Sequence, residues 1–164
     1  MRLSDYTDYT LRVLMYCAQH RERLVTIAEI ATFHNVSKSV LMKIVNALGQ
    51  QGVLETVRGR GGGIRLGADA ASVRIGDVVR AAETDFRLVE CFDRDHNTCR
   101  IDRACALKRC LHQALNAYFA VLDAVTLADL EMPRTVAVTL PAPTSARATD
   151  GASLMSSRRN KKGP

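Results

Sequence analysis

Three of the five cysteines lie in one short polar stretch: Cys91, Cys99 and Cys105, with seven and then five residues between them. Thiolates are soft ligands that bind zinc or the iron atoms of an iron–sulfur cluster. Cysteines without such a role are usually buried among apolar side chains, whereas many residues between these three are charged. Their spacing and neighbours therefore favour metal binding over three incidental thiols, and a fourth ligand remains to be found.

The other two cysteines fall on predicted helices. Cys17 lies on the apolar stripe of a first helix that begins near Ser4. We expect it to be a small core residue, because the stripe recurs at three- and four-residue intervals. Cys110 lies inside a long helix that follows the cysteine stretch, where we expect packing rather than metal ligation.

A helix-turn-helix is predicted between Thr26 and Gly52. Thr26 and Glu29 match a capping box that starts a short helix, which breaks at His34. Ser37 can then cap a second helix. The buried face of that second helix is predicted to consist of Val40, Leu41, Ile44, Val45 and Leu48.

The outward face of the second helix favours DNA binding. Any corner between two helices could share the hydrophobic pattern, so the argument depends on the side chains that point outward. A recognition helix presents its N-terminal end to base edges and phosphates. Here that face is polar or basic, with Ser37, Lys38, Ser39, Met42, Lys43 and Asn46.

A basic hairpin is predicted directly after the helix-turn-helix. Two short strands, V-L-E-T-V and I-R-L, are joined by R-G-R-G-G-G, a turn that needs positive φ. A hairpin in this position is a wing, on which Arg58, Arg60 and Arg65 could reach phosphates or the minor groove. Five Lys or Arg residues against one acidic residue occur in 34–66. No G-K-[S/T] follows the glycines, so a phosphate-binding P-loop is not predicted.

Composition limits the class of protein. A length of 164 residues predicts one domain of ordinary size. The net charge of +6 suggests a polyanionic partner, but five basic residues against one acidic residue fall in 135–164, so the local charge is the better argument. We recognise no secretory signal and no membrane-spanning run, and expect a cytoplasmic protein in which thiols stay reduced.

Three further segments follow the wing. Residues 74–82, R-I-G-D-V-V-R-A-A, predict a short amphipathic helix. The long helix after the cysteines should reach about Leu130. Its apolar stripe could pack on the chain's own core, but such a seam commonly pairs with its twin in a homodimer. The stripe consists of Leu107, Leu111, Ala114, Tyr118, Leu122 and Val125.

The predicted fold is therefore mainly α with a small β-hairpin wing. Residues 1–85 form a winged helix-turn-helix domain, and residues 86–131 form the cysteine loop and a long dimerisation helix. Residues 132–164, which contain all four prolines, are expected to be a disordered tail. The basic end of the tail, R-R-N-K-K, could add non-specific affinity for DNA or simply be a solvated run of charge.

The order of these motifs resembles the BadM-type family of winged-helix transcription regulators over roughly residues 1–131. The likeness is carried by D-Y-T-L-R, V-R-G-R-G-G-G-I-R-L-G, R-I-G-D-V-V-R, the three cysteines and T-L-A-D-L. The cysteines mark the members that bind an iron–sulfur cluster. R-I-D-R-A-C-A-L-K with T-L-A-D-L looks most like the nitric-oxide-sensing repressors of the family. Members that follow iron–sulfur supply carry a histidine where this chain has Lys108.

The resemblance also implies the fourth ligand. In the nitric-oxide-sensing members a carboxylate on the first helix of the other protomer completes the site, and the matching residue here is Asp8. Arg12 stands one turn further along, at the spacing of an i,i+4 ion pair, and would hold that carboxylate in place. A carboxylate is a harder and weaker ligand for iron than a thiolate, so one iron would be easier to displace.

The implied protein is a homodimeric repressor without enzyme activity. It would carry one iron–sulfur cluster per protomer, with 4Fe–4S favoured by the resemblance and 2Fe–2S as the alternative. It would bind an inverted-repeat operator in double-stranded DNA and release it when nitric oxide nitrosylates the cluster. No nucleophile is placed beside a base, so a cysteine hydrolase is not predicted.

Alternatives for the signal and the metal stay open. The same ligands would serve a relative that senses iron or cluster supply. Three thiolates would equally hold a structural zinc ion in a winged-helix dimer. If Asp8 is not the fourth ligand, His96 within the cysteine stretch is another candidate.

Overall fold

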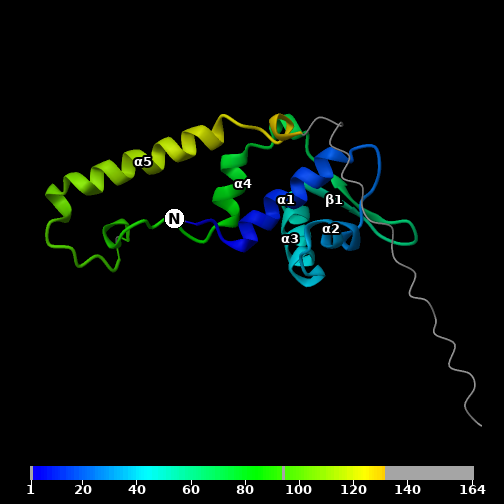
Figure 1. Ribbon diagram of the computed structural model, residues 1–164, viewed down its shortest axis with the longest axis horizontal. Coiled ribbons are helices and arrows are strands. Elements are labelled where there is room, and N and C mark those ends of the chain that lie inside the picture. Colours follow the sequence, from blue (N-terminus) through cyan, green and yellow to red (C-terminus); the bar gives the residue numbers. More distant parts are fainter. Residues whose placement is uncertain (1, 94, 132–164) are drawn as a thin grey trace, which may run out of the picture.

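The computed structural model describes residues 2–93 and 95–131, so the predicted disorder of 132–164 lies outside it. The described chain contains five α-helices and one two-stranded antiparallel sheet. The helices are α1 (Asp5–Gln19), α2 (Ile27–His34), α3 (Lys38–Gln50), α4 (Ile75–Ala82) and α5 (Ala106–Asp123), and the strands are β1 (Leu54–Val57) and β2 (Gly63–Leu66). This arrangement, seen in Figure 1, confirms the predicted mainly α fold with a hairpin wing.

The core is built around α1. Ser4 caps this helix, because its hydroxyl accepts the backbone N–H of Thr7 at 3.2 Å. The stripe of Val13, Leu14 and Cys17 is at most 1% exposed, and α1 contacts α3, α4 and β2. Burial raises the pKa of the Cys17 thiol to about 12, so this cysteine is the neutral core residue that its position on the stripe predicts.

The helix-turn-helix begins with the predicted capping box. The backbone N–H of Glu29 donates to Thr26 Oγ1 at 3.1 Å, and the Glu29 carboxylate accepts from the backbone of Thr26 in return. Asn35 takes the left-handed conformation, with φ 53°, and ends α2. A residue in this conformation ends a helix and turns the chain away from the helix axis, so α3 can start at Lys38, three residues after Asn35.

The second helix matches its predicted buried face in most positions. Leu41, Ile44, Val45 and Leu48 are at most 4% exposed, whereas Val40 is only partly buried. Ser37 occupies the N-cap position as expected. Its hydroxyl, however, pairs with the Ser39 hydroxyl at 3.2 Å instead of accepting a helix N–H.

The wing is a tight hairpin in which β1 pairs with β2 in antiparallel register. Gly59 and Gly61 have positive φ, and a Cβ added at Gly62 would lie 2.3 Å from the carbonyl oxygen of Val57. Only glycine fits such an approach. The hairpin is attached to the core through a bridge between Val25 and Ile64.

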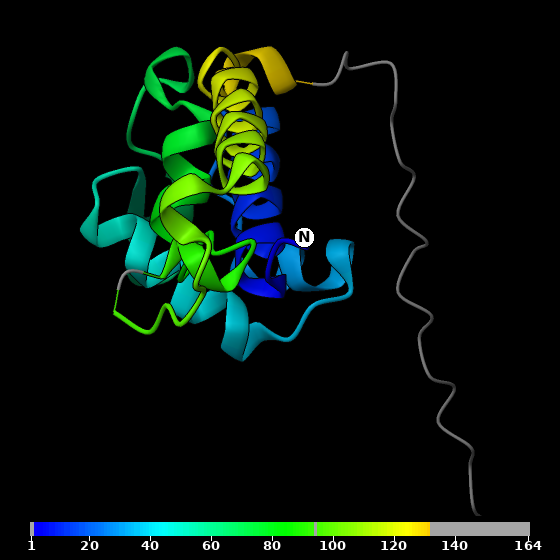
Figure 2. The same cartoon turned by 90° about the vertical axis from the view of Figure 1, so that its left-hand side faces the viewer.

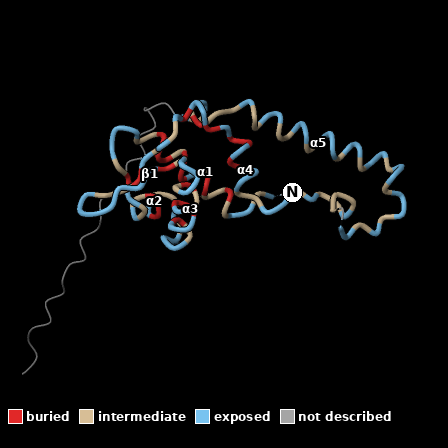
Figure 3. The backbone as a smooth tube through the Cα atoms, turned by 180° about the vertical axis from the view of Figure 1, so that it is seen from behind, coloured by how far each residue is buried: buried red, intermediate tan, exposed pale blue. Residues whose placement is uncertain are grey.

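The long helix forms an arm that leaves the winged domain (Figure 1) and is seen nearly end-on in Figure 2. It ends at Asp123 and not near Leu130 as predicted. The T-L-A-D-L stretch instead contains a 3-10 turn, η4 (Ala128–Leu130), because the chain returns to the core there. Leu127 is 1% exposed, and its N–H donates to the carbonyl of Val73 at 2.8 Å. No residue of α5 itself is buried, as its colouring in Figure 3 shows.

Candidate metal loop and DNA-binding face

The cysteine loop lies at the end of the arm far from the wing. Cys91 lies in the 3-10 turn η2 (Glu90–Phe92), Cys99 in the following loop and Cys105 at the N-cap of α5. All three are free and half-buried. The loop runs back along the helix, since the Phe92 ring stacks on His112 with ring centroids 4.0 Å apart.

Carboxylates inside the loop fix its shape. Glu90 accepts two hydrogen bonds from Thr98, from the backbone N–H and the hydroxyl, each at 2.6 Å. Asp102 accepts from the ammonium group of Lys108 at 2.5 Å. These hydrogen bonds favour the ionised forms and lower the pKa values of Glu90 and Asp102. Both carboxylates are therefore occupied in holding the loop.

Cys105 caps the N-terminal end of α5. Its sulfur accepts the backbone N–H of Lys108 at 3.4 Å, as the cap of the 18-residue α5. The N-terminal end of a helix carries partial positive charge and stabilises an anion. Lys108 stands where some cluster-binding members of the family were expected to carry a histidine ligand. Here its backbone N–H binds Cys105 and its side chain binds Asp102.

The three thiols of the loop are suitable ligands for an iron–sulfur cluster, but in the single chain they do not converge on one point. Among residues 2–93 and 95–131, no three Cys, His, Asp or Glu side chains converge as a group able to hold a metal ion. The predicted ligands Cys91, Cys99, Cys105 and Asp8 are therefore not brought together within one chain. Three free thiols on one loop remain suitable soft donors, and metal ligands are often ordered only when the metal binds.

The two remaining candidate ligands, His96 and Asp8, are already paired. His96 is exposed, and its Nδ1 lies 3.1 Å from a carboxylate oxygen of Asp93. Asp8 lies on α1, where it forms the predicted i,i+4 ion pair with Arg12. That pair is half-exposed, at 44% for each side chain. Asp8 is therefore presented on the outside of the winged domain, where a second protein molecule could reach it.

His34 lies close to this ion pair, whereas the sequence pattern identified it only as the end of a short helix. It is the last residue of α2, and its Nε2 is buried without a hydrogen-bond partner among the described residues. Burial lowers the pKa of His34, and the charge of Arg12 lowers it further while that of Asp8 raises it. The helix-turn-helix therefore sits within electrostatic range of the Asp8–Arg12 pair. The burial of one ring nitrogen leaves no periodic signal in the sequence, so only the tertiary contacts reveal it.

The proposed DNA-binding residues form an exposed and unpaired basic surface. Met42 on the outward face of α3 is 58% exposed, and its polar neighbours are exposed as well. Within the described residues, no ion pair engages the basic side chains of Lys38, Lys43, Arg58 and Arg60, and Ser37 and Ser39 lie beside them at the start of α3. Their charge is therefore available for phosphates.

Arg65 differs from the other wing arginines. Its guanidinium pairs with Glu55 directly across the hairpin, with Nε 2.9 Å from Oε2. To bind a phosphate, as expected from the sequence, Arg65 would have to give up its ion pair with Glu55. The sequence could not show this, since only the strand register places the two residues opposite each other.

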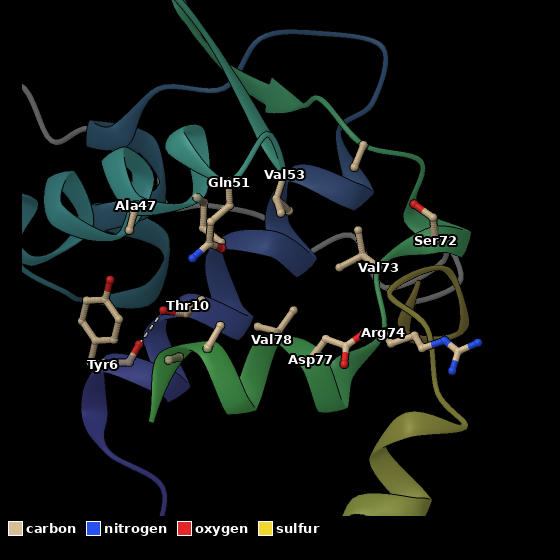
Figure 4. Close-up of a pocket in the computed structure, with 14 residues that line it drawn as sticks. Tyr6, Thr10, Ala47, Gln51, Val53, Ser72, Val73, Arg74, Asp77 and Val78 are labelled. Carbon is tan, nitrogen blue, oxygen red and sulfur yellow. Dashed lines mark hydrogen bonds between the residues drawn. The ribbon is translucent and has the colours of Figure 1, made fainter. Parts of the chain in front are cut away.

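A cavity of about 320 Å³ lies between α1, α3 and α4 (Figure 4). Its lining is mostly apolar and includes Ala47, Val53 and Val78, with Tyr6 at one end and Arg74 at the other. Across this space α3 and α4 make little direct contact, whereas each contacts α1. Helix α1 is therefore the shared support of both.

The sequence profile of one family matches residues 3–132, and its description is Rrf2, iron-dependent transcriptional regulator. The chain is also 53% identical over 131 residues to the HTH-type transcriptional regulator NsrR of Bacillus subtilis, which covers 79% of this chain and 90% of that protein. It is 43% identical to protein aau3 of Rhizobium meliloti, over 82% of this chain and 87% of that protein.

Solved structures give the same fold. The T. potens IscR structure matches with a TM-score of 0.64 at 24% identity, covering 79% of this chain and 85% of that one. The oxidised form of Staphylococcus aureus CymR matches with a TM-score of 0.65 at 25% identity, covering 81% and 98%. None of the helices in residues 2–93 and 95–131 has the length and apolar character needed to cross a membrane.

Proposed function

The chain belongs to the Rrf2 family of transcriptional regulators, which are not enzymes, and on that premise we propose that it is a repressor that senses nitric oxide through an iron–sulfur cluster. The observation that carries the proposal is the set of three free, half-buried thiols on one loop of a chain that is 53% identical to an NsrR protein. Such a protein would work in the cytoplasm, where thiols stay reduced.

The cluster would be held by this chain's cysteines and completed by a second copy. Cys91, Cys99 and Cys105 would supply three thiolates, and Asp8 of the partner subunit would supply a carboxylate. One cluster per protomer is proposed, with 4Fe–4S favoured over 2Fe–2S. When bound, the cluster supplies iron atoms that react with nitric oxide. The carboxylate is the weaker ligand of the set, so that link between the protomers would be the first to break.

Dimerisation through α5 is supported by its surface. The helix has 18 residues, none of them buried, and Leu107 and Val121 on it are 63% and 66% exposed. A helix with apolar side chains along its length needs a partner in water. A second copy of α5 provides one with two-fold symmetry, and a two-fold protein reads an inverted repeat in double-stranded DNA.

Helix α1 would carry the signal to DNA. It bears Asp8 and Arg12 on one side, and it packs against α3, the helix with the exposed polar face. A cluster that binds Asp8 would fix α1 against the partner's loop. Loss of that link would free α1 to shift, and α3 would follow because it contacts α1 directly. The operator would then be released.

The test is anaerobic purification followed by iron and sulfide analysis and titration with nitric oxide while DNA binding is measured. Brown protein with iron and sulfide, whose DNA affinity falls on adding nitric oxide, is the expected result. Colourless protein with stoichiometric zinc would replace the proposal with a zinc-stabilised regulator. A cluster protein that ignores nitric oxide but loses DNA affinity when iron is chelated would be a sensor of iron or cluster supply.

A further inference from the structure

The R-I-G-D-V-V-R segment forms a joint between the winged domain and the arm. Arg80 on α4 binds Asp123, the last residue of α5, through two parallel hydrogen bonds: Nη1 to Oδ1 at 2.8 Å and Nη2 to Oδ2 at 2.6 Å. A bidentate arginine–carboxylate pair fixes direction as well as distance. These two residues are 43 positions apart in the sequence, so the pair joins two separate elements.

Two further residues restrict the same contact. The Arg80 guanidinium carbon lies 4.3 Å from the centroid of the Phe119 ring, one turn before Asp123 on α5. On the other side, a Cβ added at Gly76 would lie 1.9 Å from Asp123 Oδ1. The carboxylate therefore rests directly on the backbone of α4, and any side chain at position 76 would push it away.

Backbone hydrogen bonds complete the joint. The N–H of Ile75 donates to the carbonyl of Val125 at 3.0 Å, and the N–H of Leu127 donates to the carbonyl of Val73 at 2.8 Å. Beyond the joint no residue of α5 is buried, and the helix runs away from the winged domain in Figures 1 and 3. The direction of the arm is therefore set at this one end.

Small changes at the joint have large effects at the far end of the arm. An 18-residue helix is about 27 Å long. A tilt of about 10° at the joint would move its far end by about 5 Å. That displacement exceeds one base-pair step of about 3.4 Å in DNA.

We propose that the α4–α5 joint, made by Gly76, Arg80, Phe119 and Asp123, sets the operator spacing that the protein accepts. The inference rests on the proposed function: two copies joined through α5 would hold two winged domains at a separation and angle fixed by this joint. Arg80 and Asp123 are positioning residues here, since neither lies on the DNA-binding face. The joint determines which distance between two half-sites both recognition helices can reach at once.

Asp77 provides a matched control for the joint. Its carboxylate also binds Arg80, at 3.2 Å, but it lies on α4 itself and is 70% exposed. Asp77→Ala and Asp123→Ala therefore remove the same chemical group from the same arginine. Only Asp123→Ala removes an ion pair that joins the two helices. Gly76→Ala tests the joint independently, because it keeps every charge and displaces the Asp123 carboxylate.

The experiment uses full-length protein purified anaerobically. An operator is selected from random duplexes with the wild type, and its two half-sites are then moved apart or together by one or two base pairs. Two base pairs rotate one half-site by about 70° relative to the other. We expect the wild type and Asp77→Ala to lose about tenfold or more in affinity across the series. The DNA affinity of Asp123→Ala and of Gly76→Ala should vary by less than about threefold across the same series. Their affinity for a single half-site should stay unchanged.

Each alternative outcome overturns the inference. A wild-type spacing profile in Asp123→Ala and Gly76→Ala would show that the joint does not set the spacing. Equal relaxation by Asp77→Ala would assign the effect to Arg80 charge and not to the joint. Uniform loss on every duplex, the single half-site included, would mean that the residues only stabilise the fold. A wild type that selects no inverted repeat would refute the proposed function, and the inference about spacing with it.

Discussion

Arg12 holds both carboxylate oxygens of Asp8 on the surface of α1. Its Nε donates to Oδ1 at 3.0 Å, and a terminal nitrogen lies 2.7 Å from Oδ2. The hydrogen bond that Arg12 donates to Asp8 is the largest cause of the raised pKa of Arg12. In the single chain each carboxylate oxygen thus binds Arg12, while the side chain stays 44% exposed. To bind iron it would have to share an oxygen with the metal or give up one bond to Arg12.

The first prediction concerns this pair. If Asp8 ligates iron across the dimer, Asp8→Ala should still assemble a cluster on the three cysteines, with an altered spectrum, and the effect of nitric oxide on DNA affinity should fall. Fold stability should change by only a few tenths of a kcal/mol, because the pair is half-exposed. Absorption spectra and operator affinity are measured with and without nitric oxide.

Arg12→Ala is the companion variant to Asp8→Ala. It keeps the Asp8 carboxylate but removes the ion pair that orients it. We therefore expect the cluster to be retained and nitric oxide to change the DNA affinity less than in the wild type. If Asp8→Ala matches the wild type in spectrum, in nitric-oxide response and in DNA affinity, the cross-dimer ligand is wrong. His96 would then be the next candidate to test.

The second prediction concerns the thiols. Alanine at Cys91, Cys99 or Cys105 should abolish cluster binding, measured as iron and sulfide per protomer. Cys17→Ala and Cys110→Ala should keep the colour. Cys17 is buried in the core, so its loss affects stability instead. Cys110 is exposed on α5 in the single chain, which does not match the packing expected for it. A bleached Cys110→Ala beside a coloured Cys91→Ala would refute the proposed set of ligands.

The third prediction concerns the wing. Arg58→Ala and Arg60→Ala should each weaken operator binding and lower the slope of log affinity against log salt by about one, as for a lost phosphate contact. The cluster spectrum should stay unchanged. Arg65→Ala is the control, and a smaller effect is expected because Arg65 is paired with Glu55. Unchanged affinity in the Arg58/Arg60 double variant would remove the wing from the DNA-binding surface.

The fourth prediction concerns acid stability. Glu29 accepts hydrogen bonds from Arg23 and from the hydroxyl of Tyr16, the latter at 2.7 Å, and they lower its pKa from 4.5 to about 2. Because the folded pKa is the lower one, the stabilisation is complete above about pH 4.5. It is lost as the pH falls toward 2.

Glu29→Gln isolates this charge, because glutamine keeps the size of the side chain and can serve in a capping box. We expect the variant to be about 1 to 2 kcal/mol less stable at pH 7, allowing for the partial exposure of the ion pair. The difference should shrink between pH 4.5 and pH 3, and urea unfolding at several pH values measures it. A difference that stays constant over this range would contradict the lowered pKa.

Some features of the fold could be predicted because their causes are local. The Thr26–Glu29 capping box joins residues three positions apart, and the glycine turn of the wing needs only its own backbone conformation. The buried stripes of α1 and α3 follow from helical period. In each case the interacting groups are neighbours in the chain, so residue type and spacing contain the whole argument.

Features that depend on distant partners could not be predicted. The hydrophobic pattern predicted that the long helix reaches about Leu130. In the structure the chain turns after Asp123, and Leu127 is buried in the core. Nothing in the local sequence predicts an ion pair between Asp123 and Arg80 or between Arg65 and Glu55. Those pairs arise from the packing of α5 on α4 and from the strand register.

By itself, the sequence determined the winged helix-turn-helix, the basic face and the three thiols available as soft ligands, because these depend on residue type and short-range spacing. The tertiary structure decided that α5 leaves the domain from a single joint, that Asp8 is held outward by Arg12, and that the three thiols do not form a closed site with other ligands in the described chain. These features depend on the relative positions of elements far apart in the sequence, which only the packed core fixes.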